Sequence, residues 1–185
     1  MPLIGVLFYF SRAPRYIPEP IIKAKLFALV LLTIVLPILL FFLLKTMQKI
    51  KSADLESTKE RVLPLGIYCI ILLIVATRIL PYNELIELYY FFIGILYSTI
   101  TCLILVLLKY KSSIHMIAVG GVIMFFIAFS IHFNINIIGS IALISIITGA
   151  IATSRLHLKA HTVLELIIGF FIGVFPQLIL LNYWL

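Results

Sequence analysis

Six apolar runs, each about 20 residues long, constrain this sequence more than any other feature. They lie at 26–44, 62–80, 88–108, 116–133, 135–153 and 162–181. Helices of this length cross the hydrocarbon core of a bilayer, where every backbone polar group must be paired within the protein. The runs are too long and unbroken to be barrel strands. The sequence therefore predicts an all-α, polytopic membrane protein built as a bundle of six spans.

The composition points to the same class of protein. Of the 185 residues, 64% are hydrophobic and 11% are charged, whereas soluble domains are roughly half apolar and a quarter charged. The net charge is +7, but the basic residues are scattered over loop ends. This favours the membrane bilayer and anionic substrates as partners, and not nucleic acid. Cys69 and Cys102 lie inside apolar runs and form no disulfide or metal pattern.

The first 25 residues are expected to form an interfacial N-terminal segment and linker, with a six-helix transmembrane domain over 26–185. The first ten residues are apolar but too short to span, and they lack the features of a signal peptide. We expect them to lie at the interface or to insert part of the way. Three prolines at 11–20 indicate an irregular linker. Pro37, inside the first span, predicts a kink.

Counting crossings sorts the polar segments onto two faces of the membrane. An even number of spans separates the loop at 45–61, the segment "KYKSSIH" at 109–115 and the segment "SRLHLKAH" at 154–161, so all three share one face. Nine Lys or Arg residues lie on this face (45, 49, 51, 59, 61, 109, 111, 155, 159) and five on the other (12, 15, 23, 25, 78). The excess would place the first face in the cytoplasm, but it nearly vanishes if several of these cations are functional. The orientation therefore stays open.

The start of the last span holds an unusual group of ionisable residues. His161 and Glu165 are four residues apart, so we expect them on one face of a helix. A carboxylate there accepts a hydrogen bond from one imidazole nitrogen and leaves the other nitrogen as a nucleophile or base. Arg155 lies six residues before His161 and can hold an anionic oxygen pair. A basic segment that snorkels to the interface, with an incidental histidine, is the simpler alternative.

The pattern Ser154-Arg155, five residues, His161, three residues, Glu165 resembles the third signature of the type 2 phosphatidic acid phosphatase superfamily. That signature ends in aspartate, so Glu165 is a departure. The resemblance implies that His161 attacks phosphorus to form a phosphohistidine. It further implies that Glu165 orients His161 and that Arg155 binds phosphate.

Two further segments resemble the other signatures of that family. "SSIH", which ends at His115, resembles Pro-Ser-Gly-His without its proline and glycine. It implies that His115 is the general acid and that Ser113 binds phosphate. "KERVLP" resembles a looser form of the first signature, found in short bacterial relatives, and implies Lys59 and Arg61 as phosphate ligands. A basic stop at a helix end is an equally simple interpretation of these two residues.

The resemblance implies a divergent, short bacterial lipid phosphatase in the inner membrane. It would hydrolyse a lipid phosphate or a polyprenyl pyrophosphate as a phosphoric or pyrophosphoric monoester hydrolase, without a metal or other cofactor. Two alternatives stay open. His157, His161 and Glu165 have the spacing of one helical stripe, which could hold zinc. A transport or non-catalytic bundle could instead bind a phosphorylated lipid without turning it over.

Four glycines are interpreted as packing residues. Gly169 and Gly173 form a pair four residues apart, typical of close helix contacts in membranes, and Gly120 and Gly121 are interpreted in the same way. His132 is expected near the opposite face, away from the candidate site.

Overall fold

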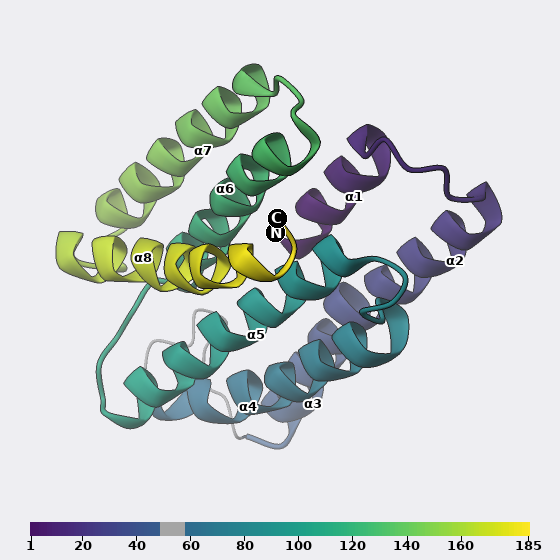
Figure 1. Cartoon of the computed structure of the whole chain (residues 1–185). Coiled ribbons are helices and arrows are strands. Elements are labelled where there is room, and N and C mark those ends of the chain that lie inside the picture. Colours follow the sequence, from purple (N-terminus) through teal and green to yellow (C-terminus); the bar gives the residue numbers. More distant parts are fainter. Residues whose placement is uncertain (49–57) are drawn as a thin grey trace.

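The computed structural model describes residues 1–48 and 58–185, except for the side chains of residues 58 and 59. Over this part of the chain the protein is helical and contains no strand (Figure 1). Among the described residues, six helical segments are long and apolar enough to cross a membrane: Glu19–Thr46, Glu60–Ile79, Ile86–Leu107, Ile114–Phe133, Ile138–His157 and Val163–Tyr183. The predicted fold class, an all-α bundle with six spans, is confirmed.

The helices follow one another with short connections. A short helix, α1 (Pro2–Arg12), precedes the spans. The first span consists of α2 (Glu19–Val30), a π-helical turn (Leu31–Val35) and α3 (Leu36–Thr46). The second consists of α4 (Thr58–Ile74) and a π-helical turn (Val75–Ile79). The others are α5 (Ile86–Leu107), α6 (Ile114–Phe133), α7 (Ile138–His157) and α8 (Val163–Leu180), which ends in a 3₁₀ turn (Leu181–Tyr183).

Two prolines explain how the first span differs from its prediction. The helix begins at Glu19 and not near residue 26, because Pro20 lies in the first turn, where a missing N–H has no intrahelical partner to lose. Pro37 follows the π-helical turn, in which the Leu36 amide donates to the Leu31 carbonyl. The wider turn accommodates a residue that cannot continue the regular hydrogen-bond pattern. The irregularity expected at Pro37 is therefore a π-helical turn.

Helix α6 lies at the centre of the bundle and packs most extensively against α8 (Figure 1). Small residues allow this approach. A Cβ atom at Gly169 would lie 2.8 Å from the Ser113 carbonyl oxygen, and one at Gly173 would overlap the Ile117 carbonyl oxygen. A Cβ atom at Gly120 would overlap the carbonyl oxygen of Phe170. The interpretation of Gly120, Gly169 and Gly173 as helix-packing residues is confirmed.

Helix α1 packs against α5 and α6, and its Val6 and Tyr9 side chains are fully buried. These two residues belong to the same hydrophobic core as α4, α5 and α6. The N-terminal segment is therefore part of the bundle's interior packing and extends into it from the end where α5 begins (Figure 1).

A buried carboxylate holds this end of the bundle together. Glu87, in the first turn of α5, is fully buried and accepts a hydrogen bond of 3.0 Å from the Tyr9 hydroxyl. Its Oε1 lies 3.1 Å from Arg15 Nη2 and 3.4 Å from His132 Nε2, without a well-aligned hydrogen bond from either. His132 lies at this end of its span, as expected, but it contacts a buried acid that the sequence analysis did not single out.

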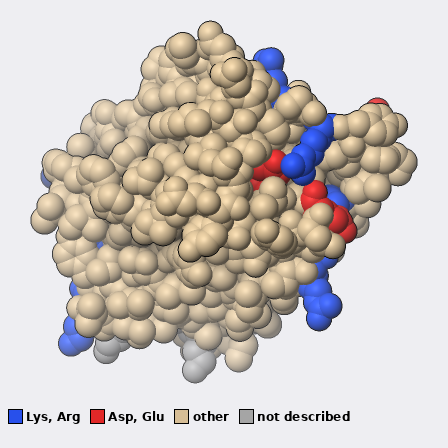
Figure 2. Space-filling model, viewed as in Figure 1, with Lys and Arg blue, Asp and Glu red and all other residues tan. Residues whose placement is uncertain are grey.

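Charged side chains gather at the edges of the molecule. In the face that Figure 2 shows, Lys, Arg, Asp and Glu atoms lie mainly toward the ends of α1 and α2, with a few at the opposite edge. The surface between them is formed by other residues. This distribution fits a bundle whose middle lies in hydrocarbon and whose ends lie in water.

Candidate active site

Four helix ends meet at one end of the bundle and carry most of the residues expected at the site. They are the first turn of α4, the start of α6, the last turn of α7 and the start of α8. The Ser113 amide donates to the Glu165 carbonyl over 3.4 Å, which joins the starts of α6 and α8. Arg155 contacts His115, which joins α7 to α6. The described parts of the three segments predicted to share one face thus lie at one end of the bundle, and residues 49–57 of the first segment lie outside the described residues.

His161 and Glu165 form a direct pair. His161 Nδ1 lies 2.8 Å from Glu165 Oε2, and the side chains are 6% and 20% exposed. A carboxylate accepts hydrogen bonds, so Nδ1 carries the proton in this contact and Nε2 keeps its lone pair in the neutral ring. The predicted contact is present, but its geometry is different from the expected one. His161 lies in the turn before α8, so the pair is not formed across one helical face.

Glu165 also caps its own helix. Thr162 is the N-cap of α8, and its hydroxyl accepts a hydrogen bond of 3.3 Å from the Glu165 amide. The Glu165 carboxylate accepts one of 3.2 Å from the Thr162 amide. This is a capping box, whose Thr-x-x-Glu pattern is visible in the sequence and was missed. Its geometry gives a reason for glutamate here: the longer side chain reaches back to both Thr162 and His161.

The environment of His161 favours the neutral imidazole. Burial lowers the pKa of His161 below its ordinary value of 6.5, and the positive charges of Lys111 and Arg61 lower it further. The hydrogen bond from His161 to Glu165 opposes this shift without reversing it. A neutral ring at pH 7 has the lone pair that a nucleophile requires.

His115 and Arg155 form the second pair. Arg155 Nη2 lies 3.0 Å from His115 Nε2. A guanidinium is always charged and can only donate, so His115 Nε2 accepts and its proton is on Nδ1. Both groups reach the solvent-exposed part of the site. An imidazole beside a guanidinium at a helix start provides a proton-transfer group and an anion ligand next to each other.

The residues between these pairs have structural partners. Arg61 is 5% exposed and donates to the Ser112 carbonyl over 3.2 Å. Ser113 is fully buried and is the N-cap of α6, where its hydroxyl accepts a hydrogen bond of 3.5 Å from the Met116 amide. Ser113 therefore caps α6, and its own amide is directed to Glu165, whereas its predicted contact with phosphate stays a prediction. The side chain of Lys59 lies outside the described residues.

Lys111 is a site residue that the sequence analysis did not select. Its Nζ donates to the Ala160 carbonyl over 3.0 Å, next to His161 in the chain. The only available signal was its place in the basic segment "KYKSSIH", which does not distinguish Lys111 from Lys109. The contact with Ala160 comes from the packing of α6 against the α7–α8 turn.

The zinc alternative is not supported by the geometry. His157 ends α7, His161 lies in the turn and Glu165 lies in α8, so the three do not form one helical stripe. Among the described residues, no three His, Cys, Asp or Glu side chains gather as metal ligands.

Comparisons with protein-family models, curated proteins and solved structures found no match to this chain.

Proposed function

We propose that this chain is an integral membrane phosphatase, in the inner membrane of a bacterium, that hydrolyses a lipid phosphate or pyrophosphate through a phosphohistidine on His161. The observation that carries the proposal is the His161–Glu165 pair, 2.8 Å apart, at the same end of the bundle as the His115–Arg155 pair. One imidazole is oriented and kept neutral by its surroundings, and the other lies beside a permanent cation. This division suits a nucleophile and a general acid.

In the proposed first step, His161 Nε2 attacks phosphorus. The N–P bond forms as the bond from phosphorus to the leaving oxygen breaks, and protonated His115 gives its proton to that oxygen. The positive charges of Arg155, Arg61 and Lys111 would stabilise the negative charge on the equatorial oxygens, which is the main catalytic requirement of phosphoryl transfer. Glu165 keeps the His161 ring in the orientation and tautomer that direct Nε2 outward.

In the proposed second step, water attacks the phosphohistidine. His115, now neutral, accepts a proton from the water as the N–P bond breaks and inorganic phosphate forms. The contact between Arg155 and His115 fits a resting state before substrate binds. A bound phosphate would attract the guanidinium to its own oxygens, and His115 Nε2 would then be able to carry a proton.

A bundle that binds a phosphorylated lipid without turnover is the second candidate. The capping box favours it, because a structural role already accounts for the Glu165 carboxylate. Such a protein would use the cations at this end of the bundle for binding alone.

Phosphate release distinguishes the two candidates. Purified protein in detergent, with chelator present, should release phosphate from phosphatidic acid, phosphatidylglycerophosphate or a polyprenyl pyrophosphate. His161→Ala should abolish release, whereas His157→Ala, which removes an exposed histidine at the end of α7, should not. Binding without release by the wild-type protein on all three lipids would favour the non-catalytic bundle, and loss of release in chelator would indicate a metal-dependent reaction.

A further inference from the structure

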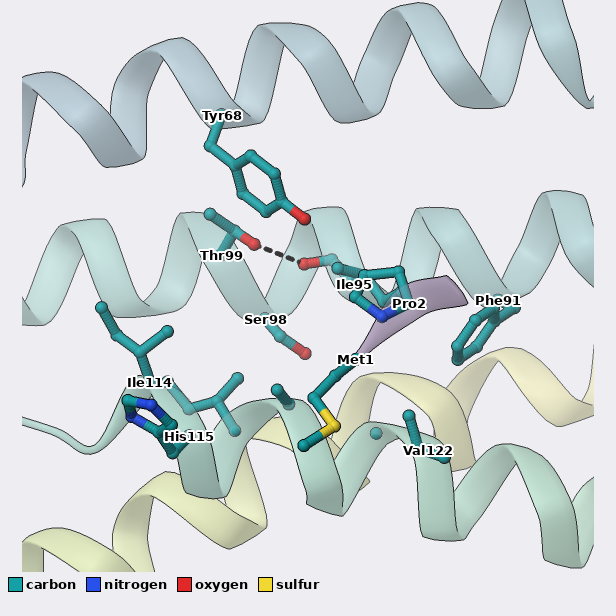
Figure 3. Close-up of a pocket in the computed structure, with 13 residues that line it drawn as sticks. Met1, Pro2, Tyr68, Phe91, Ile95, Ser98, Thr99, Ile114, His115 and Val122 are labelled. Atoms are coloured by element: carbon teal, nitrogen blue, oxygen red, sulfur yellow. Dashed lines mark hydrogen bonds between the residues drawn. The ribbon is translucent and has the colours of Figure 1, made fainter. Parts of the chain in front are cut away.

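An apolar cavity of about 260 Å³ opens next to His115, between α1, α4, α5 and α6. Figure 3 shows His115 at one end and Phe91 at the other, with Met1 and Pro2 of α1 between them. None of the described residues that line it is Lys, Arg, Asp or Glu. Its polar residues are His115, Tyr68, Ser98, Thr99 and the amino-terminal Met1, and the rest of the lining is apolar. A predominantly apolar space of this kind, beside a polar site in a membrane protein, suits a hydrocarbon chain.

Three hydroxyl groups line the cavity, on Tyr68, Ser98 and Thr99, and two of them are directed to backbone carbonyls. Thr99 Oγ1 donates to the Ile95 carbonyl over 2.8 Å (Figure 3). Ser98 Oγ lies 2.9 Å from the carbonyls of both Gly94 and Ile172. The hydroxyl hydrogens of Thr99 and Ser98 are therefore directed to backbone carbonyls and are not available to a ligand.

The cavity begins on one side of the proposed site only. His115 lines it, and His161, Arg155 and Glu165 do not. In the proposed reaction His115 protonates the leaving oxygen, and in a lipid phosphate monoester that oxygen carries the hydrocarbon. The general acid therefore lies between the phosphate and the place where the chain of the leaving alcohol would go.

Helix α1 lines the cavity with Met1 and Pro2, away from His115, and contacts along its length fix its position. A Cβ atom at Gly5 would lie 2.7 Å from two ring atoms of Phe91, so α1 packs directly on this residue of the cavity wall. Beyond Gly5, the Tyr9 hydroxyl donates to the buried Glu87 carboxylate. The position of Met1 and Pro2 is thus determined by contacts along the rest of α1.

We infer that this cavity binds the hydrocarbon chain of the leaving alcohol and that α1 is the wall that limits how much of the chain it takes. The inference rests on the proposed function, because it uses the role of His115 to choose which side of phosphorus faces the cavity. It names a lipid phosphate monoester as the substrate class, and it assigns chain-length selection to residues of α1, α5 and α6.

The test uses alkylphosphonates, which cannot be hydrolysed, so that binding is measured without turnover. Methyl-, hexyl-, decyl- and hexadecylphosphonate are titrated into the purified full chain in one detergent. In the wild type, affinity should rise with chain length and then stop rising when the chain reaches Met1 and Pro2. Each buried methylene is worth roughly fourfold in affinity. Detergent competes for the chain equally in all variants, so differences between variants report the cavity.

Ala118→Phe places a large side chain in the cavity, and Ala142→Phe places the same side chain on the exposed surface of α7. Ala118→Phe should weaken decylphosphonate by more than about tenfold, because it displaces two or more methylenes, and leave methylphosphonate unchanged. Ala142→Phe should bind all four probes as the wild type does. Ala118→Leu introduces a smaller side chain and should cause an intermediate loss of decylphosphonate affinity. It keeps the test valid if Ala118→Phe does not fold.

The outcomes separate this inference from the proposed function. If affinity stops rising at a shorter chain length in Ala118→Phe than in the wild type, the result would support binding of the chain in the cavity, even if the protein releases no phosphate. If the wild type releases phosphate, but Ala118→Phe, Ala118→Leu and Ala142→Phe each bind the four probes as the wild type does, the cavity does not bind the chain. That result would overturn the inference and leave the proposed phosphatase activity standing. Affinity that rises steadily to hexadecylphosphonate would overturn the role of α1 as an end wall.

Discussion

Glu165 Oε2 accepts hydrogen bonds from two neighbours, His161 Nδ1 at 2.8 Å and the Thr162 amide at 3.2 Å. One carboxylate therefore starts helix α8 and orients the proposed nucleophile. Because both contacts use the same oxygen, the position of His161 depends on the integrity of the helix cap. Substitutions at Glu165 should separate the two roles.

Glu165→Gln should keep the fold and lose activity. Glutamine at this position of a capping box can still accept from the Thr162 amide, so the free energy of unfolding should fall by no more than about 1 kcal/mol. The neutral amide should no longer hold His161 in one tautomer, and turnover should fall by roughly four orders of magnitude, as it does when the orienting acid of a hydrolytic triad is disabled. Thermal unfolding and phosphate release, measured on one preparation, check both statements.

Glu165→Asp is the matched control, because it keeps the charge and shortens the side chain. It should weaken the cap, which needs the longer reach, and it restores the residue of the resembled signature. Turnover at the wild-type level in Glu165→Gln would show that the His161–Glu165 contact is structural only.

Activity should depend on pH through His161. Its pKa is lowered below 6.5 by burial and then by the charges of Lys111 and Arg61. The nucleophile must be neutral, so kcat/KM should fall as the pH falls through this lowered pKa.

The His161 imidazole should also make the fold less stable at low pH, because the imidazole binds its proton at a higher pH in the unfolded chain than in the folded one. Stability should therefore decrease as the pH falls below 6.5.

Lys111→Gln should move this acid limb to higher pH, because removal of a nearby positive charge raises the pKa of His161. Lys109→Gln, two residues away, is the control and should leave the limb in place. The ionisation of the substrate is common to all proteins in the comparison and cancels. An unchanged limb in Lys111→Gln would contradict the assignment of the limb to His161.

The parts of this structure that depend on local pattern and on the parity of crossings could be predicted from the sequence. The six apolar runs predicted the spans. The parity of the crossings predicted that Arg155, His115 and His161 lie at one end of the bundle. The four-residue spacing of His161 and Glu165 predicted that both lie on a helix, whereas the helix capped by Thr162 begins two residues after His161. The capping pattern could have corrected this.

The buried acid Glu87 could not have been predicted in this way. Its neighbours in the chain form an ordinary polar turn, "PYNELIEL". Its partners Tyr9, Arg15 and His132 come from α1, the linker and α6. Only the packing of these distant segments removes Glu87 from water, and one sequence does not show that packing.

Glu87→Gln should destabilise the bundle. Glu87 is fully buried, and the Tyr9 hydroxyl would lose a charged acceptor. We expect a loss of about 1–3 kcal/mol in the free energy of unfolding. The loss should be smaller than for breaking a fully buried ion pair, because the Arg15 side chain is 42% exposed and can turn to solvent. Glu19→Gln, in the exposed pair with Lys23, should change stability by less than about 0.5 kcal/mol. Equal effects of the two substitutions on thermal unfolding would argue against a structural role for the Glu87 cluster.

Gly169→Ala should damage the site through the backbone. The new Cβ atom would lie 2.8 Å from the Ser113 carbonyl oxygen, so α8 would have to move away from the start of α6. Overpacking of this kind costs about 1–3 kcal/mol, and here it separates the segments that hold His161 and His115. Gly149→Ala, in α7 with open space around it, should leave both stability and activity intact. If the two alanine variants have equal turnover, the α6–α8 contact does not position the site.

Trapping of the covalent intermediate tests the central claim most directly. The protein is mixed briefly with a phosphorus-labelled lipid phosphate, quenched in denaturant and divided between acid and alkali. The account predicts a label on the wild-type chain that is stable in alkali and lost in acid, retained in His157→Ala and absent in His161→Ala. Label at full yield in His161→Ala would contradict the assignment of His161 as the nucleophile.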